Sequence, residues 1–208
     1  MGGLLVLFLI GLYIWIAYKI ARRTPPIWGK ALIVVVAILI PTADAVYGRY
    51  KLKEMCAAEG GLRIYRVVEG AAGFDDPKSR PDESWLRMRK YQFVEGKELS
   101  GKRSRLSVRP DDTFLREEGI TPISEYVYED ERNDSNNVYY RYEQRIRVKA
   151  SGEILGRYID FNYAGGWFER FVSGIYAARG TAGTCGPFIS ATKFVPQILK
   201  PIESESKS

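Results

Sequence analysis

The sequence contains no histidine, the side chain that most often acts as a general base near neutral pH. This absence excludes Ser/His and Cys/His nucleophile pairs and imidazole metal ligands. The chain also lacks the G-x-S-x-G, P-loop, G-x-G-x-x-G and C-x-x-C patterns. We therefore predict a protein that is not an enzyme and has no cofactor or metal site. Carboxylates offer the remaining route to catalysis, and the candidates are Asp75 with Asp76, Asp111 with Asp112, and Asp160.

Excess positive charge is also scarce outside the first third of the chain. The formal net charge is +6, and much of it comes from a basic cluster before residue 31, so the rest of the sequence is nearly balanced. A nucleic-acid-binding domain needs a basic surface of its own. The run Gly101–Arg109 is the best candidate for such a surface. Its alternation is more typical of a strand with arginines on the solvent face, and we predict no nucleic-acid partner.

Two long apolar runs stand at the start of the chain. Residues 3–20 and 31–47 are rich in Leu, Ile, Val and aromatic side chains. Eighteen helical residues extend about 27 Å, close to the roughly 30 Å hydrocarbon core of a bilayer. Residues 21–30 contain two prolines that end the first helix. Residues 1–50 are therefore predicted to form a transmembrane helical hairpin surrounded by membrane lipid.

The short connection between these runs predicts the orientation of the hairpin. Basic residues concentrate in loops that stay in the cytoplasm, and here they are Lys19, Arg22, Arg23 and Lys30. We predict a bacterial inner-membrane protein with residues 21–30 in the cytoplasm and both termini in the periplasm. An alternative is that the second run is a signal peptide cleaved after Ala45, because Ala43 and Ala45 occupy the small-residue positions of a cleavage site. In either case the remainder is exported.

Asp44 is the unusual polar residue of the predicted membrane region. Ionisable residues within membrane spans are functional candidates, because they pair with another helix or mark a polar path. The alternative is simple hydration at the membrane surface, about one helical turn from Arg49. Asp44 is therefore a candidate intramembrane polar site, and it supports no claim of transport.

The remaining sequence predicts a compact, strand-rich domain over residues 51–200. A membrane-proximal stalk helix is expected to end at Gly60 and Gly61. Strands separated by short turns favour a mainly antiparallel sheet, most clearly at residues 138–149, where apolar and charged side chains alternate. Residues 71–84 read as a surface loop, residues 165–178 as a short amphipathic helix and residues 201–208 as a flexible tail. The predicted class is a membrane-anchored α+β protein with one or two short helices.

Only two cysteines are present, Cys56 after the second apolar run and Cys185 in a glycine-rich stretch. Disulfides persist in oxidising compartments such as the periplasm. The predicted export therefore favours a Cys56–Cys185 disulfide. The competing interpretation is a pair of buried free thiols in a cytoplasmic domain.

The function that fits these features best is a non-enzymatic binding or assembly module that presents a periplasmic domain to an envelope partner protein. Aromatic side chains are enriched in protein interfaces, and the candidates here are Tyr126, Tyr128, Tyr139, Tyr140, Tyr142, Tyr158, Phe161, Tyr163 and Trp167. The alternative is an envelope sensor or small-ligand receptor. Its contact residues would be Tyr163, Gly165, Gly166, Trp167 and Arg170, because the glycines let backbone approach a ligand.

Overall fold

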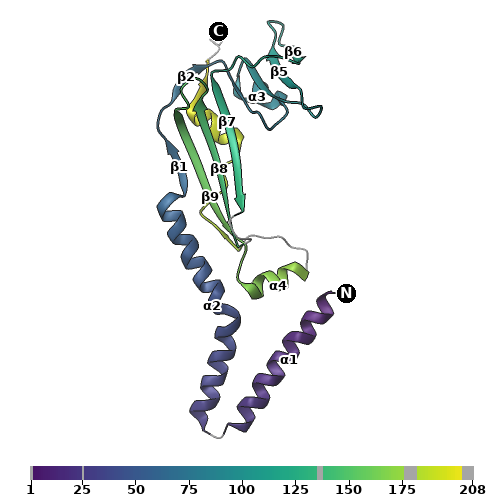
Figure 1. Ribbon diagram of the computed structural model, residues 1–208, viewed down its shortest axis with the longest axis vertical. Helices are drawn as coiled ribbons and strands as arrows, with labels where there is room; N and C mark the ends of the chain where they lie inside the picture. The colour runs from purple at the N-terminus through teal and green to yellow at the C-terminus, as the bar shows by residue number, and fades with distance from the viewer. Residues whose placement is uncertain (1, 25, 135–137, 176–181, 203–208) are drawn as a thin grey trace. The chain divides into compact units, whose positions relative to one another are not determined.

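The computed structural model describes residues 2–24, 26–134, 138–175 and 182–202 (Figure 1). The chain divides into two compact units. The first contains residues 1–59, 133–141 and 161–185, and the second contains residues 60–132, 142–160 and 186–208. Three strands, β7 (Tyr126–Asp134), β8 (Tyr139–Val148) and β9 (Ile154–Tyr163), contribute residues to both units.

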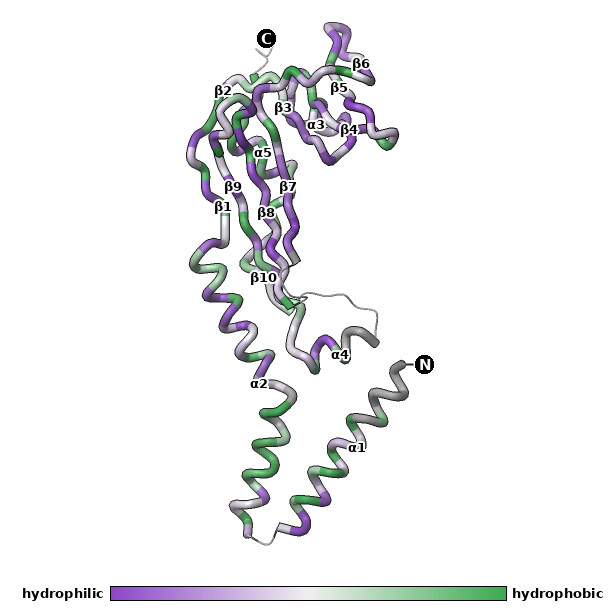
Figure 2. Tube along the Cα trace, in the orientation of Figure 1, coloured by the Kyte–Doolittle hydropathy of each residue, from purple (hydrophilic) through white to green (hydrophobic). Residues whose placement is uncertain are grey.

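The first unit begins with a pair of helices, α1 (Gly2–Arg23) and α2 (Ile27–Glu59). The Tyr13 hydroxyl of α1 donates a hydrogen bond to the Ala37 carbonyl of α2 at 2.7 Å. Figure 2 shows that apolar residues dominate the first half of α2, whereas the second half of α2 is mixed. The coloured part of α1 is mostly apolar before the basic residues at its end. Helix α2 runs without interruption through the predicted stalk and ends before Gly61, whose φ of +97° is accessible to glycine. A helix therefore covers the residues predicted for the stalk, and the position of that helix next to a membrane stays a prediction.

Membrane crossing remains a prediction from the sequence. Within the described part of the chain, no single helix has both the length and the hydropathy of a membrane span. Two parts of α2, Ile27–Ala37 and Thr42–Glu59, satisfy the criteria together by length and composition, and they meet at a bend of 51°. Pro41 lies in the break between them, and a proline inside a helix removes a backbone hydrogen bond.

Helix α4 (Trp167–Ile175) and strand β10 (Gly183–Thr184) complete the first unit. Strand β10 pairs antiparallel with the end of β9, with Gly183 opposite Tyr163. Helix α4 falls within the range predicted as an amphipathic helix, and Tyr176 and the residues after it in that range lie outside the described residues. Both α1 and α2 contact α4.

The second unit is built on most of a large mixed sheet, in the order β1-β9-β8-β7-β3-β4-β5-β6. Strand β1 pairs antiparallel with β9, and β4 and β6 both pair antiparallel with β5. The predicted α+β class with a large, mainly antiparallel sheet is confirmed. The strands not yet given bounds are β1 (Gly61–Ile64), β2 (Val68–Ala71), β3 (Gly73–Asp75), β4 (Phe93–Lys97), β5 (Arg103–Val108), β6 (Phe114–Glu118) and β11 (Leu199–Pro201).

Strand β8 shows how the alternating sequence builds the core. Gln144 and Ile146 are fully buried, and Tyr142 and Val148 pack against the hydrophobic core. On the other face Arg147 donates to Glu129 at 2.7 Å. The predicted inward face is therefore confirmed. Glu143 departs from the pattern, because it is only 8 % exposed although its position in the alternation predicted contact with water.

Three sequence predictions about this unit were wrong. The loop predicted over residues 71–84 contains β3, a fully buried strand that pairs parallel with β4 and β7. Helices α3 (Glu83–Arg89) and α5 (Ala191–Ile198) were not predicted. Pro201, assigned to the tail, belongs to β11, which pairs parallel with β2, and residues 203–208 lie outside the described residues. A three-residue strand among Gly, Asp and Pro is too short to show an alternating pattern.

Candidate functional site

Asp44 of α2 caps the beginning of α4. Its Oδ2 accepts a hydrogen bond from the Trp167 backbone N–H at 2.5 Å. The first N–H groups of a helix have no partner within the helix, and a carboxylate satisfies them and complements the helix dipole. The Glu169 carboxylate accepts a second such bond from the Gly166 N–H at 3.0 Å. Asp44 therefore has a partner on a helix 123 residues away in sequence.

Two glycines allow the close approach of α2 to this segment. A Cβ atom at Gly166 would lie 2.7 Å from the Asp44 Oδ1 atom and 3.0 Å from the Ala45 Cβ. The preceding Gly165 has a φ of +99°, which side chains other than glycine rarely adopt. The free space provided by Gly166 is thus occupied by α2, at the position where the sequence suggested the approach of a ligand.

A pair of tyrosines forms the second part of this contact. Tyr163 is 1 % exposed, and its hydroxyl donates to the Asp44 backbone carbonyl at 3.3 Å. Its ring stacks on Tyr139 with 5.3 Å between the ring centroids. The Tyr139 hydroxyl donates to the Gly48 carbonyl at 3.2 Å. Burial raises the pKa of Tyr163, so its hydroxyl stays protonated and remains a donor at neutral pH.

An ion pair between Arg49 and Glu169 closes the contact on its exposed side. Ion pairs between solvent-exposed side chains contribute only about 0–1 kcal/mol to the stability of the folded state. Here the pair holds the Glu169 side chain where it also accepts from Gly166. Arg170 is exposed, and Trp167 is about half exposed, so both project from α4. We use the name α2–α4 contact for Asp44, Gly48, Arg49, Tyr139, Tyr163, Gly165, Gly166, Trp167 and Glu169.

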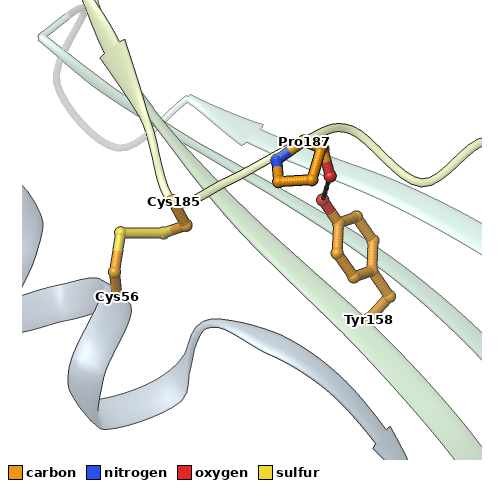
Figure 3. The surroundings of a disulfide bond; sticks show 4 residues. All are labelled: Cys56, Tyr158, Cys185 and Pro187. Atoms are coloured by element: carbon orange, nitrogen blue, oxygen red, sulfur yellow. Dashed lines mark hydrogen bonds between the residues drawn. A yellow bond between two sulfur atoms is a disulfide. The ribbon is translucent and has the colours of Figure 1, made fainter.

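A disulfide joins α2 to the residue that follows β10, farther along α2 than the α2–α4 contact. Cys56 and Cys185 are bonded, with 5.3 Å between their Cα atoms (Figure 3). Cys185 directly follows β10, and Leu52 of α2 lies 3.0 Å from the position of a Cβ atom at Gly183. The predicted pairing is confirmed. Cross-linking residues 129 apart would stabilise the folded state by about 5 kcal/mol in the chain-entropy model.

The α2–α4 contact combines capping, ring stacking and an ion pair, and this combination fastens the two helices to each other. Along α2, Asp44 and Cys56 are about three turns, or about 18 Å, apart. The stalk is thus fastened at two separated points. Within the contact, the Asp44 Oδ1 atom is buried and has no hydrogen-bond partner among the residues described. In the same ranges no group of three or more His, Cys, Asp or Glu side chains could hold a metal ion.

The first nominated pair of carboxylates has separate roles in the second unit. Asp75 is 4 % exposed and pairs with Arg103 and with Lys149, whose Nζ atom lies 3.2 Å from Asp75 Oδ2. Asp76 Oδ1 accepts from the backbone N–H groups of residues 78 and 79, both at 3.2 Å, which closes a turn. Burial raises the pKa of Asp76, and these hydrogen bonds oppose that rise. Both carboxylates are occupied by contacts within the fold.

The other nominated carboxylates lie elsewhere. Asp111 accepts hydrogen bonds from the Thr113 backbone N–H at 3.2 Å and from its hydroxyl at 2.6 Å, and the neighbouring Asp112 has a φ of +60°. This is the geometry of a polar turn. Asp160 lies on β9 and is 2 % exposed. The candidates for carboxylate chemistry therefore do not converge on one site.

The basic run Gly101–Arg109 is partly neutralised by buried acids. Arg105 donates to the fully buried Glu95 at 2.7 Å. The backbone N–H groups of Ile123 and Ser124 donate to the same carboxylate at 2.9 and 3.0 Å. Burial raises the pKa of Glu95, but these hydrogen bonds outweigh it and hold the pKa below the usual range. This part of the run stabilises the sheet instead of presenting free positive charge.

Comparisons with protein-family models, curated proteins and solved structures gave no match to this chain. The residues of the α2–α4 contact and the exposed side chains of the second unit therefore carry the functional argument. Most of the nominated aromatic residues contribute to the fold, since four are buried and four are partly buried; Trp167 is the exposed member. The buried ones are Tyr128, Tyr158, Phe161 and Tyr163, and the partly buried ones are Tyr126, Tyr139, Tyr140 and Tyr142.

Sequence reasoning missed Gly48 and the pairing of Arg49 with Glu169, which it had considered only as a residue that could orient a ligand. Arg49 and Glu169 are 120 residues apart, and no local pattern links them. Gly48 did carry a signal. A glycine inside a helix costs about 1 kcal/mol relative to alanine, so it often marks a close approach by another group. Here the approaching group is the Tyr163 ring.

Proposed function

We propose that this chain is a non-enzymatic binding or assembly module of the bacterial inner membrane. Its helices α1 and α2 anchor it in lipid, with residues 21–30 in the cytoplasm, and its strand-rich part meets an envelope partner protein in the periplasm. The basic residues flanking the connection between the helices support this orientation. The apolar first half of α2, with Val34, Val35 and Ile40 each at least 50 % exposed, supports a lipid environment.

The Cys56–Cys185 disulfide is the observation that carries the proposal. Disulfides are rare in the cytoplasm and persist in the periplasm. Cys56 lies on α2, the helix that also contains the apolar run. An oxidising environment at one end of α2 and a basic connection at its other end are what a helix crossing the inner membrane requires.

A candidate partner surface lies at edge strand β1 of the second unit. Ile64 of β1, and Tyr65 and Val67 in the segment that follows it, are each 40 % or more exposed. Ile154 of β9 is also exposed, and the backbone N–H of Tyr65 donates to the carbonyl of the next residue, Leu155, at 2.8 Å. An exposed edge strand with apolar neighbours is a favourable place for a partner strand to add.

Site-specific photocrosslinking in cells tests the proposal. The photoreactive residue would replace Ile64 of β1 or Tyr65, the residue directly after it, and Asp112, in an exposed turn, as the matched control. We expect the first two positions to give one dominant crosslinked protein that co-purifies after mild detergent extraction, and the control position to give none. A chain that gives no crosslink at either site and purifies alone as a monomer in several gentle detergents would contradict the assembly function.

The alternative function, an envelope sensor or small-ligand receptor, would use the segment from Tyr163 to Arg170. Within this segment, Tyr163 and both glycines are buried, and the space beside Gly166 is filled by α2. These positions favour the assembly module over a receptor at this segment. Ligand-dependent thermal stabilisation of the full chain would favour the receptor instead.

A further inference from the structure

Large exposed side chains gather around the α2–α4 contact. On α4, Trp167 is 47 % exposed and Phe171 is 39 % exposed. On α2, Val46, Tyr47 and Tyr50 are each between 65 % and 68 % exposed. Single exposed apolar residues are common on protein surfaces. A group that includes Trp and Tyr beside an apolar helix is the composition of the aromatic belt that forms at a membrane surface.

A second set of aromatic residues lies at the opposite end of the helical hairpin. Trp28, the second residue of α2, is 84 % exposed, while Trp15 and Tyr18 of α1 are 54 % and 63 % exposed. Trp28 and Tyr47 are separated by about 28 Å along the helix at 1.5 Å per residue, and the bend shortens this distance. The hydrocarbon core of a bilayer is about 30 Å thick. The two aromatic sets can therefore lie at opposite surfaces of one bilayer, one set at each surface.

The α2–α4 contact fixes α4 at the level of the first set, beside Val46, Tyr47 and Tyr50 of α2. Asp44 caps the first turn of α4, and Asp44 lies about 6 Å along α2 from Ile40, where the unbroken apolar run ends. Glu169 pairs with Arg49 of α2, so this acidic side chain of α4 is neutralised at the contact. Trp167 and Phe171 remain exposed. A short helix held at this level with exposed aromatic residues has the properties of an interfacial helix.

We propose that α4 is a membrane-interface helix, with Trp167 and Phe171 inserted among the lipid headgroups and first acyl carbons of the periplasmic leaflet. Exposed Arg170 can then pair with lipid phosphate. The inference rests on the proposed membrane anchor. Lipid is the occupant that fits best, because the exposed apolar surface of α2 continues from Leu39 and Ile40 to Val46 and Tyr47 without a charged residue other than Asp44, which α4 covers.

Tryptophan fluorescence quenching by brominated lipids tests this insertion. The full chain would be reconstituted into vesicles of phosphatidylcholine and phosphatidylglycerol, with bromine near the headgroup end of the acyl chains. A variant with Trp15→Phe and Trp28→Phe retains Trp85 and Trp167. Adding Trp167→Phe leaves Trp85 alone, so the difference between the two isolates the Trp167 signal without altering the core around Trp85.

The membrane anchor is tested separately. A variant with Trp15→Phe and Trp167→Phe reports on it through the quenching of Trp28 emission by brominated lipid. We expect brominated lipid to remove most of the Trp167 emission, with aqueous iodide having little effect. Loss of Trp28 emission combined with an iodide-sensitive, lipid-insensitive Trp167 would overturn the interfacial helix and leave the anchor intact. Lipid-insensitive emission from both Trp28 and Trp167 would contradict the anchor itself. A cooperative unfolding transition followed by near-ultraviolet circular dichroism establishes that each variant is folded.

Discussion

Replacing Gly48 by alanine is a sharp test of the α2–α4 contact. Gly48 lies inside α2, and an added Cβ atom would be 2.2 Å from the Tyr163 hydroxyl oxygen and 2.3 Å from the Cζ atom of that ring. Tyr163 is buried and stacked on Tyr139, so the ring has little room to move. The substitution must therefore displace either α2 or the Tyr163 ring.

The sign of the effect distinguishes this position from an ordinary helical glycine. At an open helix position, Gly→Ala adds about 1 kcal/mol of stability, because alanine is the better helix former. At Gly48, overpacking costs about 1–3 kcal/mol, and losing the hydrogen bond from Tyr163 to Asp44 costs about 1 kcal/mol more. The net expectation is a loss of about 1–3 kcal/mol.

Unfolding of the full chain in mild detergent, followed by near-ultraviolet circular dichroism, measures this loss as a lower midpoint. Gly11→Ala in α1 is the matched control, because nothing lies within 4 Å of a Cβ atom added there. Combining Gly48→Ala with Tyr163→Phe removes the closest clashing atom, so the two losses should not add fully. A Gly48→Ala variant as stable as the unmodified chain would refute the close approach of Tyr163 to α2.

Three further predictions concern single side chains. Ile146→Asp should lower the free energy of unfolding by more than about 4 kcal/mol or prevent folding, because it buries an unpaired charge in the core. Arg147→Gln should lower it much less, and equal unfolding midpoints for the two variants would refute the assigned face. Asp44→Ala should lower the free energy of unfolding by about 0.5–2 kcal/mol, and Asp44→Asn should lower it less because asparagine also caps helices. The protection of the Trp167 amide from hydrogen exchange should likewise fall more in Asp44→Ala than in Asp44→Asn. The hydrogen bond from Arg147 holds the pKa of Glu129 below its usual range, against burial, which raises it. The stability that this carboxylate contributes is present above its unfolded pKa of about 4.3 and is lost as the pH falls through the folded value, so Glu129→Gln should weaken the acid dependence of urea unfolding.

Local patterns predicted much of the fold. The alternation over residues 138–149 identified β8 and its buried face, because one side of the strand packs on the core and the other meets water. Gly60 and Gly61 marked the end of α2, because glycine readily adopts the left-handed geometry that follows a helix. The disulfide followed from the count of cysteines and the predicted compartment.

Features that depend on distant residues could not be predicted. Strand β3 takes its identity from neighbours β4 and β7, which pair with it along both edges, and its own three residues resemble a loop. The cap of α4 by Asp44 joins residues 123 apart, so neither sequence neighbourhood reveals it. The sequence did single out Asp44 and the segment from Tyr163 to Trp167, but it assigned the glycines to a ligand instead of to α2.

The redox state of the two cysteines in living cells tests the central claim most directly. Cells would be quenched with acid to trap thiols, and the protein labelled with a thiol-specific reagent before and after reduction. The proposed periplasmic location predicts no labelling of Cys56 or Cys185 before reduction, complete labelling afterwards and faster mobility on a non-reducing gel. Full labelling of both cysteines without reductant would contradict the disulfide and the exported topology together.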